Sequence, residues 1–307
     1  MTRAVVFAYH NVGARCLEVL LRHGIEVPLV VTHDDDPREA IWFERVADIA
    51  SGHGIPFITP ADPNTDEIVE RIRDLRPAFL FSFYYRHMLS PALLALPARG
   101  ALNMHGSLLP KYRGRAPVNW AVLHGESETG ATLHYMATKP DAGDIVAQTA
   151  VPVLPDETAQ DVFEKVTAAA VATLDRVVLP LVEGRAPRIP QDLAKGSYFG
   201  GRKPEDGRID WSRSAREIHN LVRAVAPPYP GAFTTVVGDE LRVLRTRVDD
   251  DDVPAGPACM YIDGGRLFAD CGGGGRLEIL AAELAGAPFA PATLAICLSE
   301  GPNPVAR

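Results

Sequence analysis

The sequence predicts an α/β protein with a mostly parallel sheet, followed by a smaller β-barrel-like domain. Three observations predict this fold. Short apolar runs alternate with helical stretches over residues 3–105, which is typical of βαβ units with right-handed crossovers. A stretch that contains Pro and Gly and lacks helical periodicity follows at 185–204. After it, short strand-like runs are separated by Gly-rich turns, as in small barrels.

Five apolar runs are expected to form parallel strands, at residues 3–9, 27–32, 56–59, 79–85 and 101–105. Helices are expected between successive strands, because apolar residues there recur at helical spacing. The first helix is expected after the turn at 10–13 and the second over 43–51. The third is expected to begin after Thr65 as its N-terminal cap, and the fourth at Ser90 and Pro91.

The pattern changes after residue 105. Strand-like runs at 129–136 and 145–154 flank a turn at 137–143, and a long helix is expected over about 158–183. A helix at 214–226 precedes the short strands of the second domain. The expected boundaries are therefore a first domain at 1–184, a linker at 185–204 and a second domain at 205–307.

The four consecutive glycines from Gly272 to Gly275 are predicted to form a hairpin turn. No Lys-Ser or Lys-Thr follows them, and no Gly-x-Gly-x-x-Gly lies near the first strand. The sequence therefore gives no support for a P-loop or a dinucleotide site.

Composition excludes several classes of protein. The net charge of -8 weighs against a nucleic-acid partner, since binding to phosphate backbones takes clustered Lys and Arg. No apolar run approaches the roughly 20 residues that span a bilayer, so no membrane insertion is expected. The apolar run near the N-terminus is too short for the hydrophobic core of a signal peptide. The four cysteines are widely spaced, namely Cys16, Cys259, Cys271 and Cys297. This spacing does not suit a metal site, and it predicts free thiols and a cytoplasmic location.

Two polar residues end the fifth strand and are the best candidates for chemistry. Asn103 and His105 are two residues apart, so their side chains leave a strand on the same face. A turn with Pro110 and Gly114 follows, and a helix is expected to begin at Pro117. Ligands of open α/β sheets bind at such strand ends.

Residues 105–114, His-Gly-Ser-Leu-Leu-Pro-Lys-Tyr-Arg-Gly, resemble the formyltransferases that use 10-formyltetrahydrofolate. The Asn-x-His pair before Ser-Leu-Leu-Pro and the later Asp141-Ala-Gly-Asp144 carry this resemblance. Further stretches at 7–10, 81–87, 114–117, 199–202, 204–206, 224–225 and 229–233 resemble the formyltransferase domain of bifunctional polymyxin-resistance enzymes. That family acts on UDP-4-amino-4-deoxy-L-arabinose in bacterial lipid A modification. It implies a Rossmann-like formyl-folate domain at 1–184 and an OB-like β-barrel at 205–307.

The resemblance also implies site residues. The catalytic trio falls on Asn103, His105 and Asp141, with donors aimed at the formyl oxygen. Asp141 is expected to hold the tautomer of His105, and either it or a bound water accepts the amine proton. Folate contacts are expected at Arg86, Met88, Leu89, Thr138, Lys139, Pro140 and Asp141. Substrate contacts are expected at Tyr9, Ser107, Lys111, Arg113, Arg115, Asn119, Phe199 and Arg202.

The basic residues after His105 are the expected partners of a diphosphate, because Arg gives bidentate contacts to phosphate. A solvent-exposed cluster is the alternative reading of Lys111, Arg113 and Arg115. Trp120 is expected to be a core residue, although it lies where it could border the sugar.

Other activities stay open at this point. Another UDP-, dTDP- or GDP-amino sugar is the nearest alternative acceptor. Methionyl-tRNA formylation shares the Ser-Leu-Leu-Pro stretch, but its relatives carry a basic loop where this chain has acidic residues at 34–36. Glycinamide-ribonucleotide formylation uses no second domain, and a non-catalytic folate or sugar-nucleotide binding protein has no need of all three trio residues.

The remaining expectations concern cofactors and partners. The co-substrate is 10-formyltetrahydrofolate, no metal is expected, and the partner is a nucleotide-sugar substrate. A homodimer is left open. No second nucleotide-binding fingerprint precedes Arg307, so only the transferase half of the bifunctional enzyme is expected.

Overall fold

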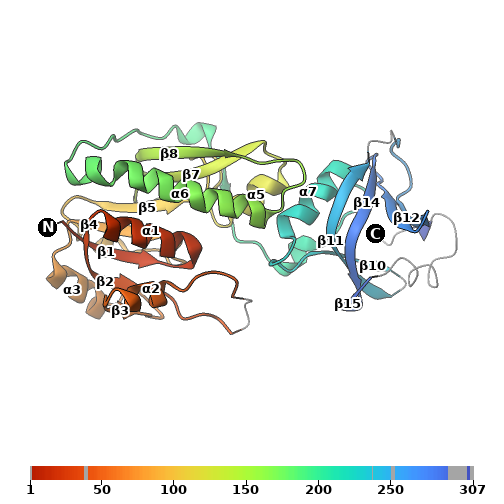
Figure 1. Ribbon diagram of the computed structural model, residues 1–307. Helices are drawn as coiled ribbons and strands as arrows, with labels where there is room; N and C mark the ends of the chain where they lie inside the picture. The colour runs from red at the N-terminus through yellow and green to blue at the C-terminus, as the bar shows by residue number, and fades with distance from the viewer. Residues whose placement is uncertain (1, 38–40, 237, 250–252, 290–302, 305–307) are drawn as a thin grey trace. The chain divides into compact units, whose positions relative to one another are not determined.

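The computed structural model describes residues 2–37, 41–236, 238–249, 253–289 and 303–304. The chain forms two compact units, whose elements are labelled in Figure 1. The first unit comprises Met1–Pro117, Glu128–Pro152 and Glu164–Gly200, and the second comprises Val118–Ser127, Val153–Phe163 and Gly201–Arg307. The domain boundaries at 184 and 205 stay a prediction.

The first unit contains a seven-stranded sheet in the order β3-β2-β1-β4-β5-β7-β8. Its strands are β1 (Arg3–Ala8), β2 (Glu26–Val31), β3 (Phe57–Ile58), β4 (Phe79–Phe83), β5 (Ala101–His105), β7 (Glu128–Tyr135) and β8 (Ile145–Pro152). The first five are parallel, and β7 and β8 continue the sheet in antiparallel pairing. The predicted α/β class with a mostly parallel sheet is confirmed.

The helices between residues 1 and 184, which the two units share, follow the predicted order. They are α1 (His10–Arg22), α2 (Val46–Gly52), α3 (Asp66–Leu75), α4 (Pro91–Leu94), α5 (Pro117–Leu123) and α6 (Ala159–Val182). Thr65 is the N-cap residue of α3, but its side chain makes no capping hydrogen bond. Ser90 caps α4 by accepting from the Leu93 amide, and α5 begins at Pro117 as predicted.

Strand β1 is buried on both faces because helices cover both sides of the sheet. Five of its six residues are buried, which fits a central parallel strand. Val5 and Phe7 share a core with the apolar stripe of α3, and with Leu93 of α4. The chain continues from β1 to β2 on one side and returns to β4 on the other. The carboxyl end of β1 is therefore a topological switch point, where such sheets bind ligands.

The stretch expected as a linker has short ordered elements of its own. It contains a 3₁₀ turn, η1 (Leu193–Lys195), and the strand β9 (Tyr198–Phe199), while a second turn, η2 (Pro204–Gly207), begins at its end. β9 pairs in parallel with β6 (Arg113–Gly114), in the loop that follows β5. This pairing brings the end of the first unit's chain back to the loop after His105.

The second unit is built on an antiparallel half-barrel sheet in the order β10-β11-β14-β13-β12-β16, with β15 paired to β14. Its elements are α7 (Ala215–Val225), β10 (Ala232–Val236), β11 (Asp239–Asp249), β12 (Cys259–Asp263), β13 (Arg266–Asp270), β14 (Arg276–Leu284), β15 (Ala287–Pro288) and β16 (Asn303–Pro304). The run from Gly272 to Gly275 joins the antiparallel strands β13 and β14, which confirms the predicted hairpin turn.

Three cysteines lie within the described residues, and all three are free thiols. Cys16 and Cys271 are buried, whereas Cys259 is half-buried. Cys297 lies outside the described residues, whereas the acidic residues at 34–36 lie within them. No helix in the described ranges has the length and apolar character needed to cross a membrane.

Candidate active site

Strand β5 places two polar side chains on one face of the sheet. Asn103 and His105 are two residues apart in β5, so both side chains leave it on the same side. β4 lies on one side of β5 and β7 on the other, which puts the pair within the sheet. His105 is buried and Asn103 is half-buried.

Asp141 reaches the same place from the turn that follows β7. Its Oδ1 lies 3.6 Å from Nδ1 of His105 and accepts a 3.4 Å hydrogen bond from Nδ2 of Asn103. Its Oδ2 accepts the backbone N–H of Gly114 at 2.9 Å. The φ of Asp141 is +52°, a left-handed conformation that aspartate tolerates better than most residues. The side chain of Gln191 donates to the Asp141 carbonyl, which holds the turn in place.

The carboxylate of Asp141 is held in its charged form. Burial acts to raise the pKa of Asp141, but the nearby charge of His105 lowers it. The backbone N–H of Gly114 adds to this lowering. The net pKa lies well below the ordinary value of 3.8, so Asp141 is ionised at neutral pH.

The tautomer of His105 is set by the main chain. Nε2 of His105 lies 2.8 Å from the carbonyl oxygen of Tyr112, which can only accept, so Nε2 carries a hydrogen. Nδ1 then faces Asp141 at a separation longer than a hydrogen bond. The Tyr112 carbonyl thus favours this tautomer from the main chain, and the expected contribution of Asp141 to it stays a prediction.

A second histidine, which the sequence analysis did not single out, completes the cluster. His134 of β7 lies directly opposite Asn103 in the strand register and is only 1% exposed. Its Nε2 is 3.2 Å from Nδ2 of Asn103 and 3.5 Å from Oδ1 of Asp141. The available signal was the strand-like run at 129–136. Once that run is paired antiparallel with 101–105, His134 falls beside Asn103.

The residues expected to contact folate lie in two segments, namely Arg86, Met88 and Leu89 after β4, and Thr138, Lys139 and Pro140 before Asp141 in the turn after β7. Leu89 belongs to the apolar core with α3 and α4, whereas Met88 is 58% exposed. The guanidinium of Arg86 lies over the ring of Tyr9, at 4.7 Å. The assignment of these residues to folate stays a prediction.

The three basic residues after His105 do not share one environment. Lys111 and Arg115 are exposed, whereas Arg113 is only 7% exposed. Among the described residues, Nε and Nη1 of Arg113 have no hydrogen-bond partner. Ser107 is fully buried, and its hydroxyl donates to the Lys111 carbonyl at 2.7 Å, which closes the loop. Their roles in substrate binding stay predictions.

Two further substrate candidates lie in the first unit. Tyr9 follows β1 at the switch point, and its hydroxyl donates to Asp35 at 2.9 Å. Phe199 of β9 stacks on the ring of Tyr112, with centroids 5.4 Å apart. Tyr112 therefore contacts His105 through its carbonyl oxygen and Phe199 through its ring.

The other two substrate candidates belong to the second unit. Asn119 is buried and donates to the carbonyl of Ala224 at 2.9 Å. The guanidinium of Arg202 lies over the half-buried ring of Trp120, at 4.8 Å. The structure therefore places Asn119 and Arg202 in contacts within that unit.

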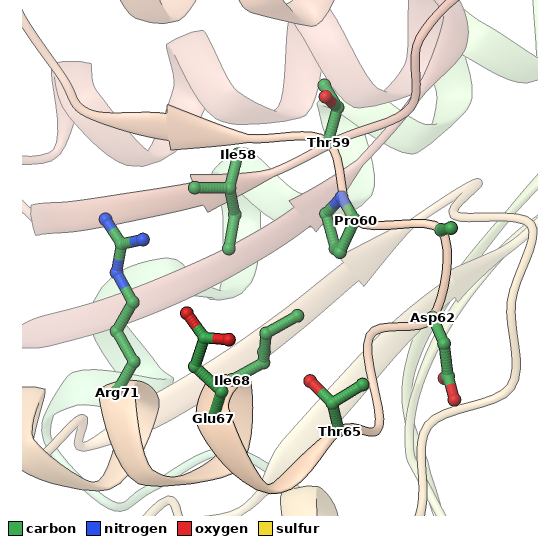
Figure 2. Close-up of a pocket in the computed structure, with 9 residues that line it drawn as sticks. Ile58, Thr59, Pro60, Asp62, Thr65, Glu67, Ile68 and Arg71 are labelled. Carbon is green, nitrogen blue, oxygen red and sulfur yellow. The ribbon is translucent and has the colours of Figure 1, made fainter.

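Figure 2 shows an open pocket between the end of β3 and the start of α3. Its lining residues are Ile58, Thr59, Pro60, Ala61, Asp62, Thr65, Glu67, Ile68 and Arg71. None of them comes from β5 or from the turn after β7, so the pocket is distinct from the cluster around His105. No set of three or more His, Cys, Asp or Glu side chains placed to hold a metal occurs in the described parts of the chain.

The fold and the cluster together define an α/β enzyme of the group-transfer kind. An amide, an imidazole and a carboxylate side by side can stabilise charge that develops on a carbonyl oxygen. The sequence model of the family described as formyl transferase matches residues 3–178, and that of the formyl transferase C-terminal domain matches residues 202–295. The chain belongs to the formyl transferase family and is a formyltransferase.

Solved structures with a similar fold include three sugar-modifying relatives. An N-formyltransferase from Helicobacter canadensis, in complex with folinic acid and dTDP-3-aminofucose, has 18% identity and a TM-score of 0.74. The match covers 91% of this chain and 99% of that one. WlaRD, a sugar 3N-formyl transferase in the presence of dTDP and 5-N-formyl-THF, has 16% identity and a TM-score of 0.72, with 92% and 98% covered. A sugar N-formyltransferase from a Shewanella species has 17% identity and a TM-score of 0.63, with 79% and 96% covered.

Proposed function

We propose that this enzyme transfers the formyl group of 10-formyltetrahydrofolate to the amine of a nucleotide-linked amino sugar. The observation that carries the proposal is the contact between Asn103, His105 and Asp141 in a chain of the formyl transferase family. Two of the similar structures were obtained with a reduced folate together with dTDP or a dTDP-amino sugar. This favours a folate donor and a sugar-nucleotide acceptor.

The reaction needs donors for a developing oxyanion. The sugar amine attacks the formyl carbon, and the C=O electron pair moves to the formyl oxygen. The tetrahedral intermediate collapses when the bond from that carbon to N10 of the folate breaks. One N–H of Asn103 and a proton on Nδ1 of His105 are the proposed donors to the oxyanion. The Nε2 hydrogen of His105 is already used by Tyr112.

Asp141 is proposed to act as a fixed negative charge. Its low pKa makes it a weak base, so it is poorly suited to collect the amine proton at neutral pH. It is well suited to stabilise a proton on the imidazole of His105, 3.6 Å away. In this proposal the amine proton leaves to a water molecule, and solvent water supplies the proton that N10 of the folate takes up as it departs.

The loop after β4 is proposed to hold the folate next to this trio. The hydroxyl of Tyr84 occupies the space beside Gly106, where an added Cβ would lie 1.9 Å from it. The loop that carries Arg86 and Met88 therefore begins against the residue that follows His105. The turn with Thr138, Lys139 and Pro140, and also Leu89, completes the proposed folate side.

The proposed acceptor is UDP-4-amino-4-deoxy-L-arabinose, which would place the enzyme in cytoplasmic lipid A modification and polymyxin resistance. This choice is supported by the sequence resemblance, in both expected domains, to the formyltransferase domain of bifunctional polymyxin-resistance enzymes. The second candidate is a dTDP-amino sugar, favoured by the dTDP and dTDP-3-aminofucose present with two of the similar structures. Buried Arg113 and exposed Lys111 and Arg115 are proposed to serve the diphosphate. The other proposed substrate contacts are Tyr9, Ser107, Asn119, Phe199 and Arg202.

A panel of acceptors tests the proposal. Purified enzyme is incubated with 10-formyltetrahydrofolate and UDP-, dTDP- or GDP-linked amino sugars, and products are scored by the mass gain of a formyl group. We expect the UDP-4-amino-4-deoxy-L-arabinose reaction to have the highest kcat/KM. Methionyl-tRNA serves as the contrasting acceptor, and efficient transfer to it alone would overturn the sugar assignment.

A further inference from the structure

His134 is buried, polar and in contact with two members of the trio. It is 1% exposed and sits opposite Asn103 across the β5–β7 pairing. A buried imidazole in a sheet costs free energy unless its nitrogens are hydrogen-bonded. Both nitrogens of His134 have a partner, and the chemistry of those partners determines which nitrogen donates a hydrogen bond and which accepts one.

The main chain determines which nitrogen of His134 carries the hydrogen. Nδ1 lies 2.8 Å from the carbonyl oxygen of Tyr135, which can only accept. Nδ1 is therefore the donor, and in the neutral ring Nε2 presents a lone pair. That lone pair faces Nδ2 of Asn103 at 3.2 Å, so Nε2 accepts one amide hydrogen.

The same arrangement determines what happens to the second amide hydrogen of Asn103. Nδ2 of Asn103, Nε2 of His134 and Oδ1 of Asp141 are separated by 3.2, 3.4 and 3.5 Å. These nearly equal sides give an angle of about 60° at Nδ2, about half the roughly 120° between its two hydrogens. One hydrogen can thus serve the two acceptors, and the other points away from them.

We propose that His134 is a positioning residue that orients the amide of Asn103, so that its second N–H faces the formyl oxygen. This inference rests on the proposed formyl transfer. Two acceptors on one side of the amide make the flipped orientation unfavourable, because it would set the Asn103 oxygen against a lone pair of His134 and the charge of Asp141. A flipped amide would also present an acceptor to the oxyanion.

Two substitutions separate the two nitrogens of His134. His134→Asn keeps a donor near the position of Nδ1 for the Tyr135 carbonyl but lacks an atom that reaches Asn103. His134→Gln places an acceptor oxygen near the position of Nε2. His53→Asn, at an exposed histidine after α2, is the matched control.

Steady-state kinetics on the preferred acceptor provide the first readout. We expect His134→Asn to lower kcat roughly 10- to 100-fold, since small misplacements of catalytic groups have such effects, with KM changed less than about 2-fold. His134→Gln is expected to recover most of this loss. A near-native kcat in His134→Asn, or an equal loss in both variants, would overturn the proposal.

A double-mutant cycle distinguishes positioning from a merely structural role. In the Asn103→Ala background, His134→Asn should have little further effect on kcat, because the amide that it orients is absent. The same fold-loss in both backgrounds would mean that His134 acts independently of Asn103. If His134→Asn does not fold, His134→Phe replaces it in the cycle.

A measurement without an acceptor keeps this inference separate from the proposed function. In protein labelled with ¹⁵N-asparagine, the side-chain amide signals of Asn103 are assigned by their loss in Asn103→Ala. We expect them to shift in His134→Asn and to stay near their native positions in His134→Gln. Unshifted signals in His134→Asn would overturn the inference, whereas a failed acceptor panel would affect only the proposed function.

Discussion

The carboxylate of Asp141 accepts the backbone N–H of Gly114 at 2.9 Å. This single hydrogen bond ties the turn after β7 to the loop after β5, two segments that are 27 residues apart. It engages Oδ2, and Oδ1 remains directed at Asn103 and His105. The loop that follows the catalytic strand thus helps to aim the carboxylate at the trio.

Replacement of His105 by alanine is expected to lower kcat by about 100-fold or more, the scale of loss for one oxyanion donor. Steady-state turnover on the preferred amino sugar measures this effect. KM for that sugar should change little, because the proposed role of His105 is at the formyl carbon. His53→Ala, at an exposed site, is the control, and near-native turnover of His105→Ala would contradict the catalytic assignment.

Replacement of Asp141 by asparagine should change the pH dependence of stability. The pKa of Asp141 is lowered in the folded protein, so its ionised form contributes stability above the unfolded value near 3.8. That contribution is lost as the pH falls from there toward the folded pKa. Urea unfolding of both proteins from pH 7 to pH 3 measures it. We expect the stability difference between wild type and Asp141→Asn to shrink below about pH 4; a constant difference would argue against a lowered pKa.

Replacement of Gly114 by alanine is expected to destabilise the first unit by roughly 1–3 kcal/mol and to lower kcat. Gly114 has a φ of +99°, and an added Cβ would lie 2.1 Å from the carbonyl oxygen of Phe199. The backbone must shift, which moves the N–H that Asp141 accepts. Thermal unfolding and turnover measure the two effects.

Gly200→Ala is the matched control for Gly114→Ala, because no atom of the described residues beyond its chain neighbours lies within 4 Å of its added Cβ. It should leave both Tm and kcat close to those of the wild type. Equal effects of the two substitutions would show that the tight approach at Gly114 is unimportant.

The described cysteines should differ in reactivity in the native protein. Burial raises the pKa of Cys271 to about 12, and burial also raises the pKa of Cys16. Cys259 is half-buried, with a smaller rise from burial and from Asp270. Alkylation at pH 8, followed by peptide mass mapping, should label Cys259 well before the other two.

Denatured, unreduced protein should then yield four free thiols, including Cys297. Fewer than four would contradict the expectation of a reducing compartment. Early labelling of Cys16 in native protein would instead indicate that the core around α1 opens readily.

The sequence by itself determined the order and type of the elements. Local periodicity encodes them, because a buried strand and an amphipathic helix place apolar residues at different spacings. The spacing of Asn103 and His105 also sufficed to put them on one face of β5, and motif resemblance pointed to Asp141. These inferences need only the neighbouring residues along the chain.

Only the tertiary structure decided which partners those side chains meet. His134 meets Asn103 because β7 pairs antiparallel with β5 in one particular register. Tyr112 sets the tautomer of His105 because the loop after β5 folds back, and Arg113 is buried as β9 returns to pair with β6. Register and loop closure depend on contacts between residues distant in sequence, so no local pattern in the chain could supply them.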